Sequence, residues 1–206
     1  AIDVLAQPNK SAETRLSMKD DSYGIWMNEI IAHLQLENVT LAGFSFGGLV
    51  ILKTLIHNES KIKDVFLSAP AYIVNGNPLK ALFKFFIPMK RFMKSKQPKF
   101  LEQFLSVAFT EKDDFAFNYL SAVFQYFEMD FTPVPVISAK EAAMIQTPIT
   151  IIAANEDIIF PGRKMIKRAK KIFPSLQHTL LLPHSKHVQN TSDNKLIANL
   201  ILDTQF

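Results

Sequence analysis

The stretch Val39-Thr-Leu-Ala-Gly-Phe-Ser-Phe-Gly-Gly-Leu-Val-Ile-Leu52 reads as a strand, a tight turn and a helix in direct succession. Its first four residues are a short apolar run, which indicates a buried strand. Gly43 to Gly48 make the turn, and an apolar segment that ends near His57 continues as a helix. The turn holds a G-x-S-x-G pattern centred on Ser45, and a strand before it and a helix after it give this short pattern its meaning.

The physical basis of the pattern is steric. A serine on such a turn takes an unusual backbone conformation, and flanking glycines let the strand and the helix approach closely. The hydroxyl of Ser45 then stands clear of the sheet at the positive end of the helix, and the N–H of Phe46 points to where an oxyanion would form. A chance match or an ordinary glycine-rich turn is the alternative, but neither G-x-G-x-x-G nor G-x-x-x-x-G-K-[ST] occurs in this turn. The segment resembles the nucleophile elbow of the α/β-hydrolase superfamily, with Ser45 as the nucleophile.

Composition sets outer limits on the function. The chain has 206 residues, of which 48% are hydrophobic and 20% charged, as expected for a globular domain with room for an inserted subdomain. The net charge of +4 is mildly basic, but no basic and aromatic stripe matches a nucleic-acid-binding module, so we expect no nucleic-acid partner. The absence of cysteine excludes disulfides, a cysteine nucleophile and thiolate-bound zinc.

The segments around the elbow predict a parallel sheet. Asp20 to Ser22 are typical helix-start residues, and the apolar side chains from Tyr23 to Leu34 recur at helical spacing. After the elbow helix, the apolar run 63–67 indicates a second strand, and a strand, a helix and a strand within this length form a βαβ unit.

The N-terminal residues are interpreted through the resemblance. Ala1–Leu5 is a brief apolar run, and Asp3, Asn9 and Ser11 look like a variant of the D-x-x-G-x-G-x-S loop that precedes the elbow in this superfamily. The resemblance therefore implies that Ala1–Leu5 is the fourth strand of the usual eight. The first three strands, and the loop that normally supplies the second oxyanion-hole N–H, are missing from this sequence, which favours an incomplete chain.

The segment from 71 to 146 has a different character. Twelve of the 18 phenylalanines lie between Phe83 and Phe131, among many lysines. We predict helices over 78–93, 99–108, 113–127 and 139–144, and no strands. The superfamily commonly inserts a helical cap at this place, so we predict a core from residues 1–70 and 147–206 and a cap from 71–146. The phenylalanines suggest an apolar acyl pocket, although most of them are expected to form the core of the cap. Its basic, partly apolar first helix favours a solvated outer face over membrane contact.

The remaining elements supply an acid and a histidine. Strands are predicted over 149–153 and 177–182, with helices over 162–173 and 193–202, the last burying Leu196, Ile197, Leu200 and Ile201. The resemblance places the catalytic acid after the first of these strands, where Asp157 fits D-x-[IV]-x-P and Glu156 is the neighbouring alternative. It places the catalytic histidine after the last strand, where His187 is preferred to His184. Lys186 stands where the family usually has glycine.

The order Ser45, Asp157, His187 is the one that this fold uses. A histidine can remove the serine proton, and a carboxylate can hold the imidazole in the required tautomer. The sequence therefore predicts a serine hydrolase, of carboxylesterase type, that cleaves a small or medium acyl ester through an acyl-enzyme. Thioesterase, carbon–carbon hydrolase, perhydrolase, transferase and lyase activities stay open, as does a catalytically inactive ligand-binding protein. A non-enzymatic interaction protein that uses the Phe- and Lys-rich segment is a further alternative.

The remaining expectations concern partners and location. No H-x-x-H, H-E-x-x-H or comparable ligand cluster occurs, so no metal or organic cofactor is implied. The expected partner is a small-molecule ester, and the oligomeric state is left open. No apolar run approaches the roughly 20 residues of a membrane span. We expect a cytoplasmic location.

Overall fold

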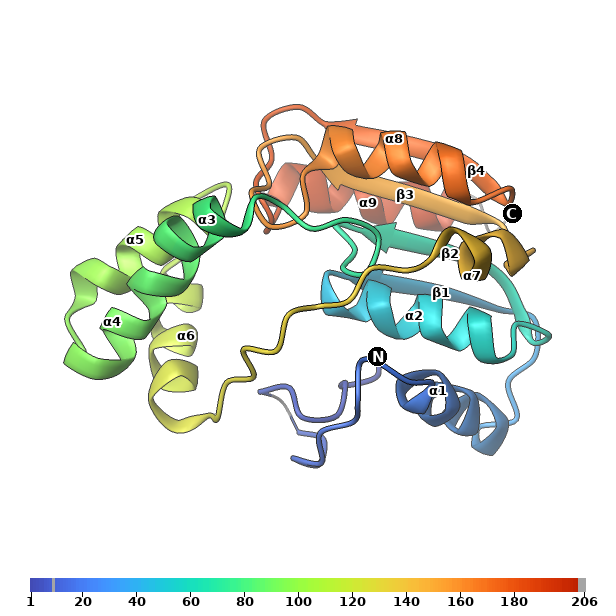
Figure 1. The fold of residues 1–206 in the computed structure, drawn as a ribbon, viewed down its shortest axis with the longest axis horizontal. Helices are drawn as coiled ribbons and strands as arrows, with labels where there is room; N and C mark the ends of the chain where they lie inside the picture. The colour runs from blue at the N-terminus through green and yellow to red at the C-terminus, as the bar shows by residue number, and fades with distance from the viewer. Residues whose placement is uncertain (9, 204–206) are drawn as a thin grey trace.

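A computed structural model describes residues 1–8 and 10–203 of the chain. The described residues form a four-stranded sheet in the order β1-β2-β3-β4, and all three neighbouring pairs are parallel (Figure 1). The strands are β1 (Val39–Phe44), β2 (Ile62–Ser68), β3 (Ile149–Ala154) and β4 (Leu176–Leu182). Each lies where the apolar runs predicted a strand, so the predicted α/β architecture with a parallel sheet is confirmed.

Helices cover the two faces of this sheet unequally. In Figure 1, α2 and α8 lie in front of the sheet with α1 packed beside α2, and α9 lies behind it. The helices of this core are α1 (Ser22–His33), α2 (Phe46–His57), α7 (Ala139–Met144), α8 (Gly162–Ile172) and α9 (Thr191–Asp203). Right-handed βαβ crossovers require helices on the sheet faces, which explains why the elbow helix α2 is buried along most of its length.

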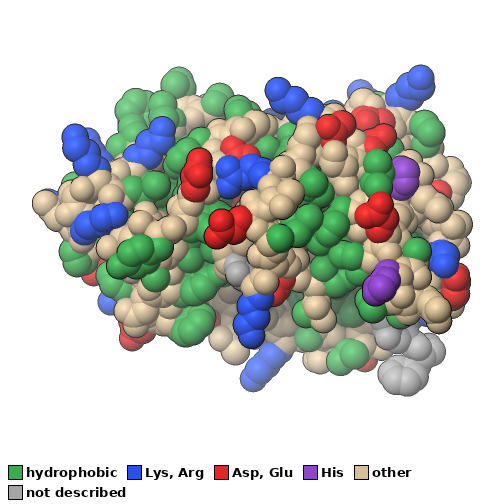
Figure 2. All heavy atoms as spheres, turned by 90° about the horizontal axis from the view of Figure 1, so that it is seen from below, with side chains coloured by type: hydrophobic (Ala, Val, Ile, Leu, Met, Phe, Trp, Pro, Cys, Tyr) green, Lys and Arg blue, Asp and Glu red, His purple; other side chains and the backbone are tan. Residues whose placement is uncertain are grey.

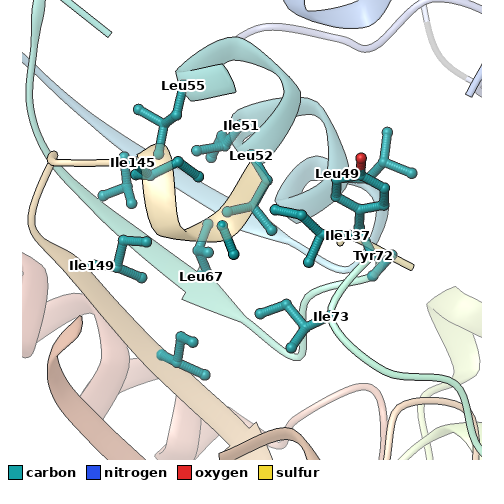
Figure 3. Packing of buried hydrophobic residues seen from close by; sticks show 14 of the residues in the cluster. Leu49, Ile51, Leu52, Leu55, Leu67, Tyr72, Ile73, Ile137, Ile145 and Ile149 are labelled. Atoms are coloured by element: carbon teal, nitrogen blue, oxygen red, sulfur yellow. The ribbon is translucent and has the colours of Figure 1, made fainter. Parts of the chain in front are cut away.

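The main hydrophobic core lies between the sheet and its front layer of helices. Leu49 and Leu52 of α2 meet Leu67 of β2 and Ile149 of β3, and Ile137 closes the same cluster (Figure 3). All five side chains are fully buried. Burying a side chain of this size stabilises the fold by about 1.5–3 kcal/mol, so this cluster fixes the elbow helix firmly on the strands.

The middle of the segment predicted as the cap forms a second, separate cluster of helices between β2 and β3, at the left of Figure 1, and the name cap is kept for this part. The two ends of the predicted segment 71–146, including α7, pack into the main core, for example through Ile73 and Ile145. It contains α3 (Pro78–Ala81), the π-helix η1 (Leu82–Phe86), α4 (Ile87–Ser95), α5 (Pro98–Ala108) and α6 (Asp114–Tyr126). Nine of its twelve phenylalanines belong to its own hydrophobic cluster. As expected, most of them form the core of the cap, and the exposed exceptions are Phe83, Phe115 and Phe131.

The first predicted cap helix is interrupted. Instead of one α-helix over 78–93, the structure has a π-helical turn over Leu82–Phe86 between α3 and α4. Pro88, the second residue of α4, has no N–H to donate to the preceding turn. A wider turn with i→i+5 hydrogen bonds accommodates that loss without breaking the helix.

The prediction of a strand over Ala1–Leu5 is wrong. These residues have no strand structure, and the neighbouring segment turns toward the cap, where Arg15 donates a 2.8 Å hydrogen bond to the carbonyl of Glu128. A strand needs a partner for its N–H and C=O groups. In the described part of the chain, none of the four strands pairs with this segment. Asn9, which was assigned to the adjoining loop, lies outside the described residues.

The prediction that α9 buries four apolar residues is also wrong. Leu196 is 48% exposed, and Ile197, Leu200 and Ile201 are only half-buried. A cavity of about 350 Å³ separates α9 from the strands, and Phe66 and Ile197 are among the residues on its opposite walls. Because α9 stands on its sheet face without a neighbouring helix among the described residues, its apolar side chains are incompletely covered.

The basic side chains of the first cap stretch lie on the surface. All seven basic residues of the first cap stretch are exposed: Lys80, Lys84, Lys90, Arg91, Lys94, Lys96 and Lys99. In Figure 2, Lys and Arg side chains stand among hydrophobic ones on the cap side of the molecule. Over the described residues, the helices are all too short or too polar to cross a membrane.

Candidate active site

The elbow holds Ser45 in a backbone conformation that few residues other than glycine adopt. Its φ is 51° and its ψ is −113°, between the end of β1 and the start of α2. The surroundings impose this conformation, because the N–H of Ser45 donates to Ser68 and its carbonyl accepts from Gly48 and Ala71, each at 2.9 Å. A strained backbone that its neighbours fix in this way is characteristic of functional sites.

The glycines of the elbow do not contribute equally. A Cβ on Gly43 would lie 2.6 Å from the side chain of Ile51, and one on Gly48 would lie 2.4 Å from Pro70. A Cβ on Gly47 would meet no described atom within 4 Å. The close approach that the sequence assigned to the glycines flanking Ser45 therefore rests on Gly43 and Gly48.

Asp157 lies in the loop after β3, and its carboxylate is buried. One oxygen, Oδ1, accepts hydrogen bonds from the backbone N–H groups of Ile159 at 2.7 Å and Phe160 at 3.0 Å. The other oxygen, Oδ2, lies 2.7 Å from Nδ1 of His187. The loop thus fixes the direction of the carboxylate independently of its contact with His187.

His187 lies in the loop after β4 and joins the other two groups. Its Nε2 is 2.8 Å from the Oγ of Ser45, while Nδ1 faces Asp157. An ionised carboxylate can only accept hydrogen bonds, so Nδ1 carries the proton and Nε2 is free to accept the serine proton. The ring also packs between Phe44 and Phe160, at centroid distances of 5.1 and 5.5 Å.

Glu156 and His184, the two alternatives considered for the acid and the histidine, lie away from Ser45. Glu156 and His184 face each other 4.0 Å apart on the surface, and the side chain of His184 is 92% exposed. Ser45, Asp157 and His187 come together although they follow three different strands. Because parallel strands end at the same edge of the sheet, residues that follow them converge in this way.

The backbone N–H of Phe46 lies in the first turn of α2, next to Ser45. The first N–H groups of a helix have no intrahelical acceptor, and they create a positive electrostatic potential at its N-terminus. This potential suits a developing negative charge. This is the position at which the sequence predicted an oxyanion-hole donor.

Contacts from the cap to the histidine loop were missed at the sequence level. Thr110, between α5 and α6, donates its hydroxyl to the carbonyl of Val188 at 2.7 Å and accepts the N–H of Lys186 at 3.0 Å. These partners are more than 70 residues apart in the chain and follow no periodic pattern. Their side chains therefore gave no signal that could have revealed the contact.

No group of three or more His, Cys, Asp or Glu side chains with the geometry of a metal site occurs within residues 1–8 and 10–203. The polar groups at the site are the serine, imidazole and carboxylate described above. Their arrangement supports proton transfer from Ser45 to His187 and stabilisation of the resulting imidazolium by Asp157.

Comparison with known proteins defines the class. The elbow, the parallel sheet and the order of the three loops are those of an α/β-hydrolase. The sequence model of the family described as serine aminopeptidase, S33, matches residues 17–188. The chain belongs to this family.

Individual relatives are distant in sequence and similar in fold. The chain is 20% identical over 189 residues to a Bacillus subtilis (strain 168) protein described as uncharacterized carboxylesterase nap, a match that covers 86% of this chain. It spans only 60% of the length of that relative.

Solved structures give the same fold. The naproxen esterase from Bacillus subtilis superposes with a TM-score of 0.80 at 17% identity, over 99% of this chain and 72% of the other. A meta-cleavage product hydrolase from Pseudomonas fluorescens IP01 superposes with a TM-score of 0.70 at 14% identity, over 95% and 74%. The predicted α/β-hydrolase fold is confirmed.

Proposed function

We propose that the protein is a serine hydrolase of carboxylesterase type that cleaves small or medium acyl esters. The observation that carries the proposal is the hydrogen-bonded series from Ser45 Oγ through His187 to the buried carboxylate of Asp157. Each distance is within the range that proton transfer by a general base requires. The carboxylesterase descriptions of two relatives support the same reaction.

In the proposed mechanism, Ser45 Oγ attacks the ester carbonyl carbon while His187 Nε2 takes its proton. The C–O bond to the alcohol then breaks, and the imidazolium returns the proton to the leaving alkoxide, which departs as the alcohol. Water attacks the resulting acyl-enzyme with the help of the same nitrogen. Collapse of that intermediate releases the carboxylic acid and restores Ser45.

The negative charge on the carbonyl oxygen needs donors that are already in place. The N–H of Phe46 at the start of α2 is the proposed donor from this chain. Loss of one such donor typically lowers kcat by about 10²–10³-fold, so the placement of the elbow contributes to catalysis beside the three proposed catalytic side chains.

Apolar surroundings favour an acyl or alkyl substrate. Phe44 is 43% exposed beside the His187 ring, and Phe160 contacts the same ring from another side. Aromatic walls with few polar groups bind the hydrocarbon part of a ligand, and the reacting ester supplies the polar contacts.

The proposal is tested with p-nitrophenyl esters of increasing acyl length, and with amino-acid p-nitroanilides because of the family description. We expect turnover of short to medium esters and its loss in Ser45→Ala. Unchanged ester turnover in Ser45→Ala would refute the assignment of Ser45 as the nucleophile. Turnover of anilides without turnover of esters would show that the substrates are amides and not esters.

Other activities of the fold are distinguished by product analysis. A competing acceptor alcohol would yield a new ester if the acyl-enzyme transfers its acyl group instead of hydrolysing it. Tight binding of an ester without turnover would identify an inactive ligand-binding protein. Lys186 at the usual glycine position does not support that alternative, because His187 keeps both of its hydrogen-bond partners beside it.

A further inference from the structure

Residues 108–111 of the cap, which we call the cap linker, pair with the histidine loop. Val188, directly after His187, donates its N–H to Ala108 at 2.8 Å and accepts the N–H of Thr110 at 3.0 Å. Phe109 and Val188 form a parallel β-bridge. The residue that follows His187 is therefore paired with the cap as if the two were adjacent strands.

The hydroxyl of Thr110 holds the loop on both sides of the histidine. It accepts the N–H of Lys186 at 3.0 Å and donates to the carbonyl of Val188 at 2.7 Å. A hydroxyl can donate once and accept up to twice, so this single group bridges backbone groups of the two residues on either side of His187.

Two side chains extend the same contact. Lys186 Nζ donates to the carbonyl of Ser106 at 2.8 Å, in the last turn of α5, where carbonyl groups lack intrahelical donors. Glu111 accepts the N–H and the hydroxyl of Thr191 at the start of α9, both at 2.9 Å. A glycine at position 186 would make no such bond to α5.

We propose that Thr110 is a positioning residue that orients His187 through the cap linker, so that the position of the cap controls the geometry of the triad. Asp157 fixes the imidazole from one nitrogen, and the cap linker fixes the backbone that carries the ring. A displaced cap would pull Val188 and Lys186 with it and lengthen the distance from Nε2 to Ser45. This proposal rests on the proposed function only where it concerns turnover.

The kinetic test compares Thr110→Val with Thr110→Ser. Valine has nearly the shape of threonine but loses both hydroxyl bonds, and we expect kcat to fall about tenfold while KM changes less than about twofold. Serine retains the hydroxyl and should restore kcat to within about threefold of wild type. Ser106→Ala is the matched control, because its hydroxyl bonds to Gln103 within α5 and not to the histidine loop.

A second readout does not require turnover. The proton on His187 Nδ1, hydrogen-bonded to Asp157, should give a sharp downfield NMR signal in wild type, Thr110→Ser and Ser106→Ala, and a broadened or lost signal in Thr110→Val. An equally sharp signal in Thr110→Val would overturn the proposal. A signal that responds as expected in a protein that hydrolyses no ester would contradict the proposed function alone.

Lys186→Met tests the same contact should Thr110→Val fail to fold. This variant keeps the backbone N–H that Thr110 accepts and removes only the bond to Ser106. We expect a two- to threefold loss of kcat, roughly the effect of one partly exposed hydrogen bond, with partial broadening of the His187 signal. A kcat and a signal identical to wild type would overturn the proposal.

Discussion

The sheet core and the cap are stabilised by different kinds of contact. In the core, residues far apart in sequence meet because parallel strands lie side by side, and α2 is buried against them along most of its length. In the cap, neighbouring helices bury a local cluster of phenylalanines that is separate from the main core. The proposed triad belongs to the core, but the loop that carries His187 is also paired with the cap. Strand order brings Ser45, Asp157 and His187 together, while the loop of His187 contacts both regions, which is why we propose that its fine placement depends on both.

The largest expected effect is the loss of kcat when the proposed catalytic acid of the core, Asp157, is replaced. Asp157→Asn should lower kcat by about 10⁴-fold, because an amide facing Nδ1 favours the wrong imidazole tautomer. Steady-state kinetics on the preferred ester measures the change. Glu156→Gln is the matched control and should stay within about twofold of wild type, since Glu156 is on the surface with His184. Equal losses in both variants would contradict the assignment of the acid.

The next largest effect is on stability, and it tests whether the cap unfolds independently of the sheet. Phe104 is buried between Phe85 and Phe124 in the cap, so Phe104→Ala should destabilise the cap by about 3–5 kcal/mol. Hydrogen exchange should accelerate in α4, α5 and α6 and stay unchanged in β2 and β3. Uniform acceleration through the sheet would show that the two regions unfold together.

A smaller effect separates two adjacent glycines of the elbow. Gly48→Ala should lower the free energy of unfolding by about 1–3 kcal/mol, because its Cβ would lie 2.4 Å from Pro70. Gly47→Ala should be neutral or stabilising by up to about 1 kcal/mol, since alanine favours a helix and meets no described atom there. Urea denaturation of both variants makes the comparison, and equal destabilisation would contradict it.

The smallest effect concerns pH. Burial raises the pKa of Tyr72 from 10.0 to about 12, with a further contribution from Glu141. Above pH 10 the unfolded chain loses this proton while the folded protein keeps it, so the free energy of unfolding should fall as the pH rises toward 12. Tyr72→Phe should reduce this decline, and the exposed Tyr126→Phe should not. Buried Tyr23, whose pKa is also raised by burial, should leave a residual slope.

The sequence predicted those features that depend on local pattern or on strand order. Ser45 was singled out because its motif lies between a strand and a helix, and Asp157 and His187 because each follows a predicted strand; the structure brings the three within hydrogen-bond distance. Features that depend on an unseen partner were not predicted. Ala1–Leu5 has strand-like residues but no strand beside it, and Leu196 has helical spacing but an incompletely covered sheet face.

The contact of Thr110 with the histidine loop shows the same limit. It joins two loops that are 78 residues apart, through one hydroxyl and backbone groups that every residue carries. Neither periodicity nor a motif marks such a pair. The π-helical turn before Pro88 was missed for a related reason, since the composition fits an uninterrupted helix and only the hydrogen-bond pattern reveals the wider turn.

The most direct test of the central claim is intact-mass analysis after incubation with a fluorophosphonate, which reacts fastest with an activated serine. We predict a single covalent adduct on the wild-type protein, localised to Ser45, and none on a folded Ser45→Ala variant. In the proposed mechanism, the activation comes from the hydrogen bond between Ser45 and His187. A folded wild-type protein that forms no adduct, or an adduct that persists in Ser45→Ala, would contradict the account.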